Sequence, residues 1–185
     1  MLNHLGTVNL ETDRLILRKL TIDDAEDAFN NWMGDPDIMW AWGVHKSIDE
    51  TKENMKGLIK EYENINNYEW GIQLKENNEV IGSICAINND ENIQSCELGY
   101  QISKYHRNKG YATEALICVL GYLIKKIGYN RIQGGHFSDN PASGKVMENA
   151  GMKYEGTLRQ NCKNKNGNLV DSKIYGILKQ DILEN

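Results

Sequence analysis

One segment of this 185-residue chain, residues 97–112, reads ELGYQISKYHRNKGYA and joins a strand pattern to a helix pattern. Its first part, Glu97–Ile102, is predicted to form a strand. From Ala112 to Ile127 the apolar residues recur at steps of three and four, which predicts a helix with one apolar stripe that ends at Gly128. The residues between them therefore form a loop at a helix N-terminus, where the first backbone N–H groups have no acceptor inside the helix.

This loop has the composition of a phosphate site. Unpaired N–H groups and the positive end of the helix dipole attract an anion. Gly110 lets the backbone approach that anion without a Cβ, Ala112 keeps the first turn narrow, and Arg107 and Lys109 add positive charge. Many helices also begin after a basic loop that contains glycine, so a solvated loop stays open as the alternative. The patterns G-x-x-x-x-G-K-S/T and G-x-G-x-x-G are both absent.

The rest of the sequence predicts an α/β (α+β) protein with a mixed sheet. Further strand patterns occupy residues 14–20, 69–74, 80–87, 131–133, 153–162 and 169–178, and further helix patterns occupy residues 21–33, 47–62 and 140–149. Thr21, Ser47 with Glu50, and Pro141 mark the helix starts. Two hairpins and one strand–helix–strand crossover give a mostly antiparallel sheet of seven strands, flanked by about four helices. No repeat or linker interrupts the chain, so residues 1–185 are expected to form a single domain.

The composition disfavours several classes of function. A formal net charge of −5 disfavours nonspecific binding to nucleic acid and mildly favours cationic partners. No apolar run approaches the ~20 residues of a membrane-spanning helix, and the N-terminus lacks the pattern of a secretory signal. Cys85, Cys96, Cys118 and Cys162 form no C-x-x-C pair and have no histidine at metal-ligand spacing. We therefore expect a metal-free protein of the reducing cytoplasm, with no membrane partner.

A family resemblance follows from an ordered set of motifs. Residues 107–112 match the loop pattern R/Q-x-x-G-x-G/A, and the chain resembles the GNAT N-acetyltransferases, in particular their RimJ/RimL-type branch. The similarity covers nearly the whole chain. It includes residues 10–18, 97–100, 110–115, 140–143, 148–152, 155–159 and 166–171. The element order of that family agrees with the order predicted above.

The resemblance implies an acetyl-CoA-dependent enzyme with the GNAT fold. A V-shaped opening is expected between the strand Glu97–Ile102 and the strand that begins near Arg131. A backbone N–H near residues 98–100 would stabilise the oxyanion that develops at the thioester carbonyl. The expected backbone contacts to the cofactor are Tyr100, Gln101 and Ile102 for the pantetheine, and Arg107, Asn108, Lys109, Gly110, Tyr111 and Ala112 for the pyrophosphate.

The predicted helix 140–149 carries the other expected contacts. Asn140 and Ser143 lie one helical turn apart and share a face, although Asn140 is also a plausible N-cap. The resemblance implies that Asn140 binds the cofactor arm and that Ser143 lies near the sulfur as the acid. Many GNAT enzymes have an acid tyrosine further along this helix, but Met147 stands there in this sequence. Lys145 is expected to reach the ribose phosphate or to remain an exposed lysine.

The acceptor amine needs a base, and Glu97 is the candidate, directly or through a water. A strand-edge carboxylate in an ion pair is the alternative for Glu97, and Glu155 is the second candidate base. Trp32, Trp40, Trp42 and His45 fall in the region that shapes the acceptor pocket in this family, or form core or a dimer contact.

The acceptor itself stays open at this stage. The resemblance implies the N-terminus of a ribosomal or other protein, or a small amine such as a polyamine, an aminoglycoside or an amino acid. A donor with an acyl chain longer than acetyl, a homodimer, and a noncatalytic acyl-CoA-binding regulatory module are further alternatives.

Overall fold

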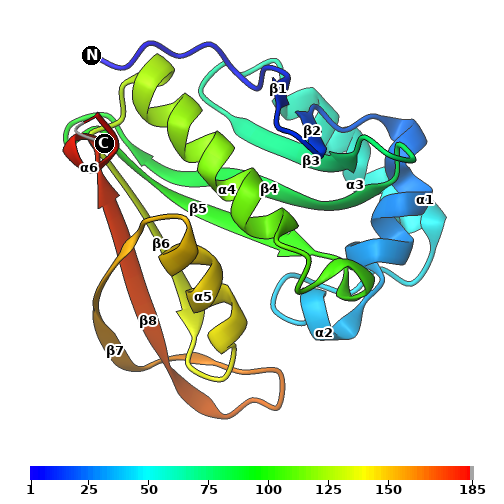
Figure 1. The fold of residues 1–185 in the computed structure, drawn as a ribbon. Coiled ribbons are helices and arrows are strands. Elements are labelled where there is room, and N and C mark those ends of the chain that lie inside the picture. The colour runs from blue at the N-terminus through cyan, green and yellow to red at the C-terminus, as the bar shows by residue number, and fades with distance from the viewer. Residues whose placement is uncertain (184–185) are drawn as a thin grey trace. The chain divides into compact units, whose positions relative to one another are not determined.

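The computed structural model describes residues 1–183, and Figure 1 shows their helices and strands. These residues fall into two compact units. The N-terminal unit contains residues 4–85 and 100–115, and the C-terminal unit contains residues 1–3, 86–99 and 116–183. Hydrogen bonds join the strands in the order β1-β2-β3-β4-β5-β6-β8-β7, so the described residues form a mixed sheet of eight strands. The strands are β1 (Leu10–Glu11), β2 (Leu15–Arg18), β3 (Tyr68–Leu74), β4 (Val80–Asp90), β5 (Ser95–Ile102), β6 (Arg131–Phe137), β7 (Lys153–Lys163) and β8 (Leu169–Leu178).

The helices follow the predicted order with two short additions. They are α1 (Ala25–Ala28), α2 (Pro36–Met39), α3 (Ile48–Glu61), α4 (Tyr111–Tyr122), α5 (Pro141–Asn149) and α6 (Lys179–Leu183). Single-turn 3₁₀ helices occupy Ile22–Asp24 and Lys104–His106, and π-helical turns occupy Phe29–Met33 and Leu123–Ile127. Among residues 1–183 no helix is long and apolar enough to cross a membrane.

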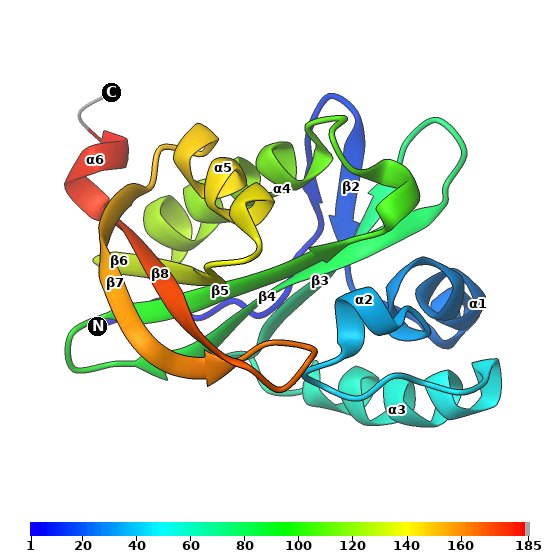
Figure 2. The same ribbon diagram turned by 90° about the horizontal axis from the view of Figure 1, so that it is seen from below.

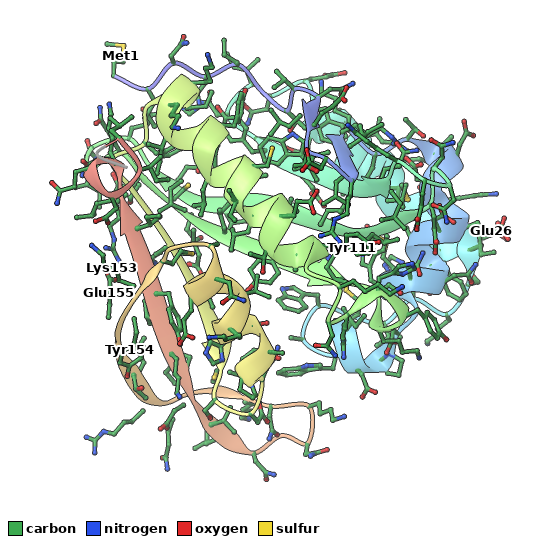
Figure 3. All side chains as sticks on the ribbon, in the orientation of Figure 1. Met1, Glu26, Tyr111, Lys153, Tyr154 and Glu155 are labelled. Atoms are coloured by element: carbon green, nitrogen blue, oxygen red, sulfur yellow. The ribbon has the colours of Figure 1, made fainter. Side chains whose placement is uncertain are left out.

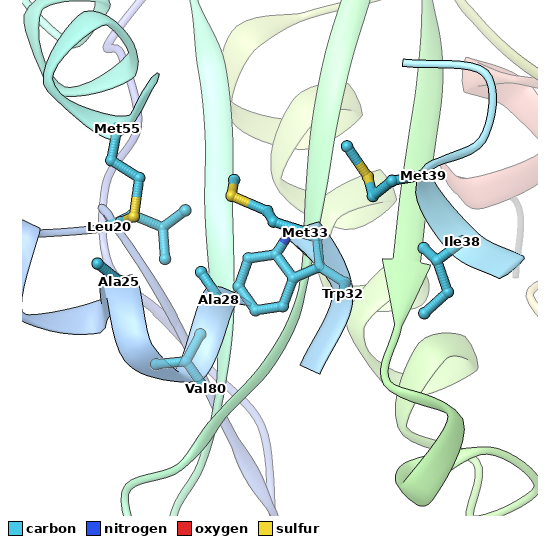
Figure 4. Packing of buried hydrophobic residues seen from close by; sticks show 9 residues of the cluster. All are labelled: Leu20, Ala25, Ala28, Trp32, Met33, Ile38, Met39, Met55 and Val80. Atoms are coloured by element: carbon cyan, nitrogen blue, oxygen red, sulfur yellow. The ribbon is translucent and has the colours of Figure 1, made fainter. Parts of the chain in front are cut away.

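The N-terminal unit is built on a clear alternation of side chains. Leu15 and Leu17 of β2 are fully buried, whereas Arg18 is only partly buried and forms an ion pair with Asp24 at 2.7 Å. Helices α1, α2 and α3 gather together in this unit (Figure 2). Apolar residues of these helices and of the π-helical turn Phe29–Met33 form a cluster with Leu20, which follows β2, and Val80 of β4. Figure 4 shows the cluster: Leu20, Ala25, Ala28, Trp32, Met33, Ile38, Met39, Met55 and Val80.

The helix starts in this unit use the predicted caps. Thr21 and Asp24 form a capping box, because the Asp24 carboxylate accepts hydrogen bonds from both the N–H and the hydroxyl of Thr21. Ser47 caps α3 by accepting from the N–H of Glu50 at 3.1 Å. These side chains satisfy N–H groups that the first helical turns leave without acceptors.

The C-terminal unit contains the crossover of the sheet. β5 and β6 are parallel, and their pairing runs from Ser95–Arg131 to Glu97–Gln133. β6 continues against β8 as far as the pair Phe137–Ser172. The parallel pairing therefore stops inside both strands, at Glu97 and Gln133. Gly128, at φ +99°, ends the preceding π-helical turn in the left-handed conformation that glycine adopts without strain.

The structure corrects three details of the predicted fold. An eighth strand, Leu10–Glu11, pairs with β2 and was too short to give a pattern of its own. The segment 22–33 is not one regular helix but a 3₁₀ turn, a short α-helix and a π-helical turn in succession. The short helices α2 and α6, with four and five residues, were not predicted because one helical turn carries no measurable periodicity.

Glu69 on β3 is a carboxylate that folding removes from water. Its backbone N–H donates to the Thr7 hydroxyl, but its carboxylate makes no hydrogen bond or ion pair within the described residues. Burial raises the pKa of Glu69 to about 7. The nearby Tyr62 hydroxyl, which accepts from the N–H of Leu20 at 2.9 Å, has a raised pKa because of burial and, in part, because of Glu69.

Glu69→Gln should therefore change how stability depends on pH. The folded-state pKa lies above the usual value near 4.5, so the wild type loses stability as pH rises from about 4.5 to about 7. The variant, which cannot ionise there, should avoid that loss, on the order of 2 kcal/mol. Urea unfolding of both proteins at pH 5.0 and 7.5 measures the difference. Parallel changes in the two proteins would contradict the assignment.

Candidate active site

The predicted phosphate loop contains two residues with a left-handed backbone. Asn108 and Gly110 both adopt left-handed conformations, with φ of +61° and +83°. Residues 107–110 are exposed, whereas Tyr111 at the start of α4 is buried (Figure 3). Left-handed residues within a short loop turn successive N–H groups toward one side, an arrangement that binds anions.

The first turn of α4 adds free donors to this loop. The first helical hydrogen bond at this end runs from the N–H of Glu114 to the carbonyl of Gly110 at 3.0 Å. The N–H groups of residues 110–113 donate no hydrogen bond to any residue in the described range 1–183. Four adjacent donors at the positive end of a helix dipole form a site for a phosphate.

The end of β5 lies in the same unit as the loop. Gln101 Nε2 donates to Ser83 Oγ at 3.0 Å. A Cβ at Gly82 would overlap the carbonyl oxygen of Gln101, so only glycine permits β4 to approach β5 at this point. Tyr100 and Ile102 flank Gln101 and are partly buried. The predicted pantetheine contacts thus lie on a backbone that is held by its neighbour strand.

The other predicted contacts lie in the C-terminal unit. Asn140 precedes α5 but makes no capping hydrogen bond; its Nδ2 instead donates to Ser143 Oγ at 3.1 Å. The alternative prediction of a side-chain cap is therefore wrong, and the two polar side chains form a pair. Lys145 is exposed and forms an ion pair with Glu148 at 3.3 Å, which satisfies its charge without a ligand. Met147 is buried in the core, consistent with its lack of an acid role.

The two candidate bases differ in their partners. Glu97 accepts one hydrogen bond, from Asn88 Nδ2 at 3.1 Å, and forms no ion pair within residues 1–183. Glu155 on β7, labelled in Figure 3, is bound by both terminal nitrogens of Arg131, one at 2.7 Å. The Arg131 guanidinium holds the pKa of Glu155 below its ordinary value. A carboxylate held as the anion in this way is a weak proton acceptor.

Cysteine and tryptophan residues take structural positions. All four cysteines are free thiols, and burial raises the pKa of Cys96 to about 12, which disfavours the thiolate. Trp32 is fully buried in the cluster of Figure 4, whereas Trp42 is 70% exposed. Of the alternatives for these residues, a core position therefore holds for Trp32 but not for Trp42. His45 Nδ1 contacts the Thr51 hydroxyl at 2.9 Å.

Sequence patterns missed two residues that contact the site. Asn88, at φ +51° in β4, supplies the hydrogen bond to Glu97. Arg14, next to β2, donates from Nη1 to the carbonyl of Lys109 inside the phosphate loop at 2.9 Å. Arg14 belongs to a motif of the family resemblance, but its distance of 95 residues from Lys109 hides the contact from any local pattern.

The fold and the loop define the class: an α/β protein with a site suited to a phosphate-bearing ligand. The chain belongs to the acetyltransferase (GNAT) domain family, whose family model matches residues 14–153. It is 33% identical over 172 residues to an uncharacterized N-acetyltransferase, YoaA, of Bacillus subtilis (strain 168), with 92% of this chain and 96% of that protein covered.

Solved structures share the fold. The crystal structure of an acetyltransferase (GNAT family) from Bacillus anthracis is 26% identical, with a TM-score of 0.78 and coverage of 94% of this chain and 99% of that one. A ribosomal-protein-S5-alanine acetyltransferase from Vibrio fischeri has a TM-score of 0.79 at 19% identity, covering 94% and 98% of the two chains, and shares the fold alone.

Family membership makes the chain an acyltransferase that uses acetyl-CoA. The residues of the loop fit that cofactor. The loop offers four unpaired N–H groups as donors for a pyrophosphate. Asn108 and Gly110 are left-handed, and Gly110 has no Cβ that would occupy the space of the anion. Coenzyme A carries such a diphosphate, so the loop suits it.

Gly110→Ala should weaken CoA binding. The left-handed φ of +83° disfavours a side chain, and the new Cβ would lie 3.3 Å from Arg14 Nη2. We expect the dissociation constant of CoA, measured by calorimetry, to rise roughly tenfold or more. Gly167→Ala is the matched control, because Gly167 has φ +78° and no atom within 4 Å of the added Cβ. Equal effects of the two substitutions would show that backbone strain alone, and not the loop, is responsible.

Proposed function

We propose that this chain, acting as one catalytic domain, transfers an acetyl group from acetyl-CoA to a primary amine by direct attack of that amine. The supporting observation is the set of free N–H groups at residues 110–113, in a loop that belongs to the GNAT family. The cofactor, when bound, supplies the acetyl thioester. Every other contribution comes from residues of this chain.

Two groups of residues are proposed to hold the cofactor. In the N-terminal unit they are the backbone of Tyr100, Gln101 and Ile102 and the loop residues Arg107, Asn108, Lys109, Gly110, Tyr111 and Ala112. In the C-terminal unit Asn140 and Ser143 are proposed contacts, since their side chains are already oriented by a mutual hydrogen bond. Lys145 remains a proposed ribose-phosphate contact that would have to leave Glu148.

Glu97 is proposed to take the proton that the acceptor amine must lose, directly or through a water. Its only hydrogen bond within the described residues comes from the neutral Asn88 amide, so no fixed cation competes with the incoming proton. Glu155, by contrast, would have to break a two-pronged bond to Arg131. This difference in partners favours Glu97 over Glu155 as the base.

Ser143 is proposed to protonate the leaving sulfur. Asn140 Nδ2 donates to Ser143 Oγ and so occupies a lone pair of that oxygen. A serine hydroxyl can also donate, so Ser143 is the residue of this pair that can supply a proton. Met147, buried and without a proton to give, leaves no tyrosine acid on this helix.

The acceptor is proposed to be the N-terminal amine of a protein. The motif set resembles the RimJ/RimL-type branch, and the Vibrio fischeri structure of the same fold is named as a ribosomal-protein acetyltransferase. The formal charge of −5 suits cationic acceptors, including small amines, without choosing among them. The free cysteines agree with a proposed site of action in the reducing cytoplasm.

An acceptor panel tests the reaction and separates these acceptors. Purified protein with acetyl-CoA should release free thiol when offered short peptides with a free N-terminal alanine or serine. The same peptides with a blocked N-terminus are the control and should give no release. Turnover only with polyamines, aminoglycosides or amino acids would replace the proposed acceptor, and CoA binding without turnover on any amine would support a noncatalytic module.

Three variants test the assigned roles on the best acceptor. Glu97→Gln should lower kcat/KM roughly 100-fold, since the base is removed. Ser143→Ala should lower kcat roughly tenfold with little change in CoA binding. Glu155→Gln is the matched control and should stay within about twofold of wild type, because its carboxylate is occupied by Arg131. A larger loss in Glu155→Gln than in Glu97→Gln would reverse the assignment of the base.

A further inference from the structure

We propose that Arg14 is a positioning residue for the phosphate loop: its guanidinium fixes the peptide between Lys109 and Gly110 so that the Gly110 N–H faces the anion. This inference rests on the proposed function, because it concerns how that same loop holds the donor. Arg14 lies in the N-terminal unit just before β2, and Nη1 donates to the Lys109 carbonyl at 2.9 Å.

The geometry of one peptide carries the argument. All peptide bonds in the described chain are trans, so the C=O of Lys109 and the N–H of Gly110 point in opposite directions. Because the carbonyl is bound to Arg14, the Gly110 N–H must point away from Arg14. That N–H is one of the four donors without an acceptor. Arg14 therefore sets the direction of a donor that it does not touch.

Glu114 holds Arg14 in place. The Glu114 Oε2 atom accepts from Arg14 Nε at 2.7 Å and lies 2.6 Å from Arg14 Nη2. The Glu114 Oε1 atom accepts from the backbone N–H of Arg14 at 3.0 Å and from the Thr12 hydroxyl at 2.6 Å. Although burial disfavours its charged form, the hydrogen bonds from Thr12 and Arg14 lower the pKa of Glu114. The carboxylate is thus a fixed anion with four donors around it.

Two further distances show that the Arg14 guanidinium lies beside the loop. Arg14 Cζ lies 4.5 Å from the centre of the Tyr111 ring, a distance typical of a cation–π contact. An added Cβ at Gly110 would lie 3.3 Å from Arg14 Nη2. Arg14 therefore contacts Lys109 and Tyr111, the residues on either side of Gly110, at the end of the loop and the start of α4.

The fork shape of the side chain, and not its charge alone, is required. The positive charge is already balanced by Glu114, so it adds little attraction for a phosphate. A guanidinium can bind the carboxylate with Nε and Nη2 and still donate from Nη1, whereas a lysine offers one ammonium group. An isolated exposed ion pair would stabilise little, but this one joins a network of hydrogen bonds. Without it, ordering the left-handed residues Asn108 and Gly110 becomes part of the cost of binding CoA.

The test compares Arg14→Ala and Arg14→Lys with wild type in the full chain. Calorimetry with CoA gives the dissociation constant, and steady-state assays give KM for acetyl-CoA and kcat. Both variants should raise the dissociation constant and KM for acetyl-CoA about tenfold, with kcat within about twofold, because a preformed loop affects donor binding more than chemistry. Thr12→Val, which removes one bond to Glu114 and leaves Arg14 intact, should give a smaller rise of about threefold.

Arg131→Ala is the matched control, since it removes an arginine from a similar two-pronged pair with Glu155 in the C-terminal unit. It should leave CoA binding unchanged. CoA binding as tight in Arg14→Ala as in wild type would overturn the inference, and so would full recovery in Arg14→Lys. A wild type that binds no CoA would instead sink the proposed function, so the two failures are distinguishable. If Arg14→Ala does not fold, the Thr12→Val and Arg14→Lys results decide.

Discussion

The first backbone N–H groups of α4 have no acceptor within the helix, and much of the N-terminal unit depends on that constraint. A helix leaves its first N–H groups without acceptors, and here those of residues 110–113 stay open. Holding them open requires a rigid loop, which is why Tyr111 is buried, Gly110 adopts a left-handed conformation and Arg14 binds the Lys109 carbonyl. These donors are available to an anion such as a diphosphate.

The carboxylates of the chain show how partners decide function. Glu114 and Glu155 are each bound by an arginine and serve the structure as fixed anions. Glu69 is desolvated without a partner, which raises its pKa to about 7. Within the described residues, the Glu97 carboxylate accepts a hydrogen bond from the Asn88 amide, pairs with no cation and is only partly buried. Of the four, Glu97 combines freedom to accept a proton with a strand position next to the end of the β5–β6 pairing.

Several features were predictable because they are local. The loop 107–112, the stop at Gly128, the caps at Thr21 and Ser47 and the start of α5 at Pro141 each depend on residues within about four positions. Features that depend on packing were not predictable in this way. Trp42 is exposed although a core position was one of its alternatives, and the Asn140 side chain donates to Ser143 instead of capping α5. The side chain of Asn140 has both options in the sequence, and its neighbours in space select one.

The sequence by itself determined the order of the elements, the helix-start loop with its glycine and the motif set that marks the family, because spacing along the chain controls turns, periodicity and caps. Only the tertiary structure decided which charged groups meet. Arg14 and Glu114 are 100 residues apart, and Arg131 and Glu155 are 24 apart. Electrostatic partners are chosen by distance in space, and no local pattern encodes that distance. The loop was therefore visible in the sequence, whereas the arginine that holds it was visible only in the fold.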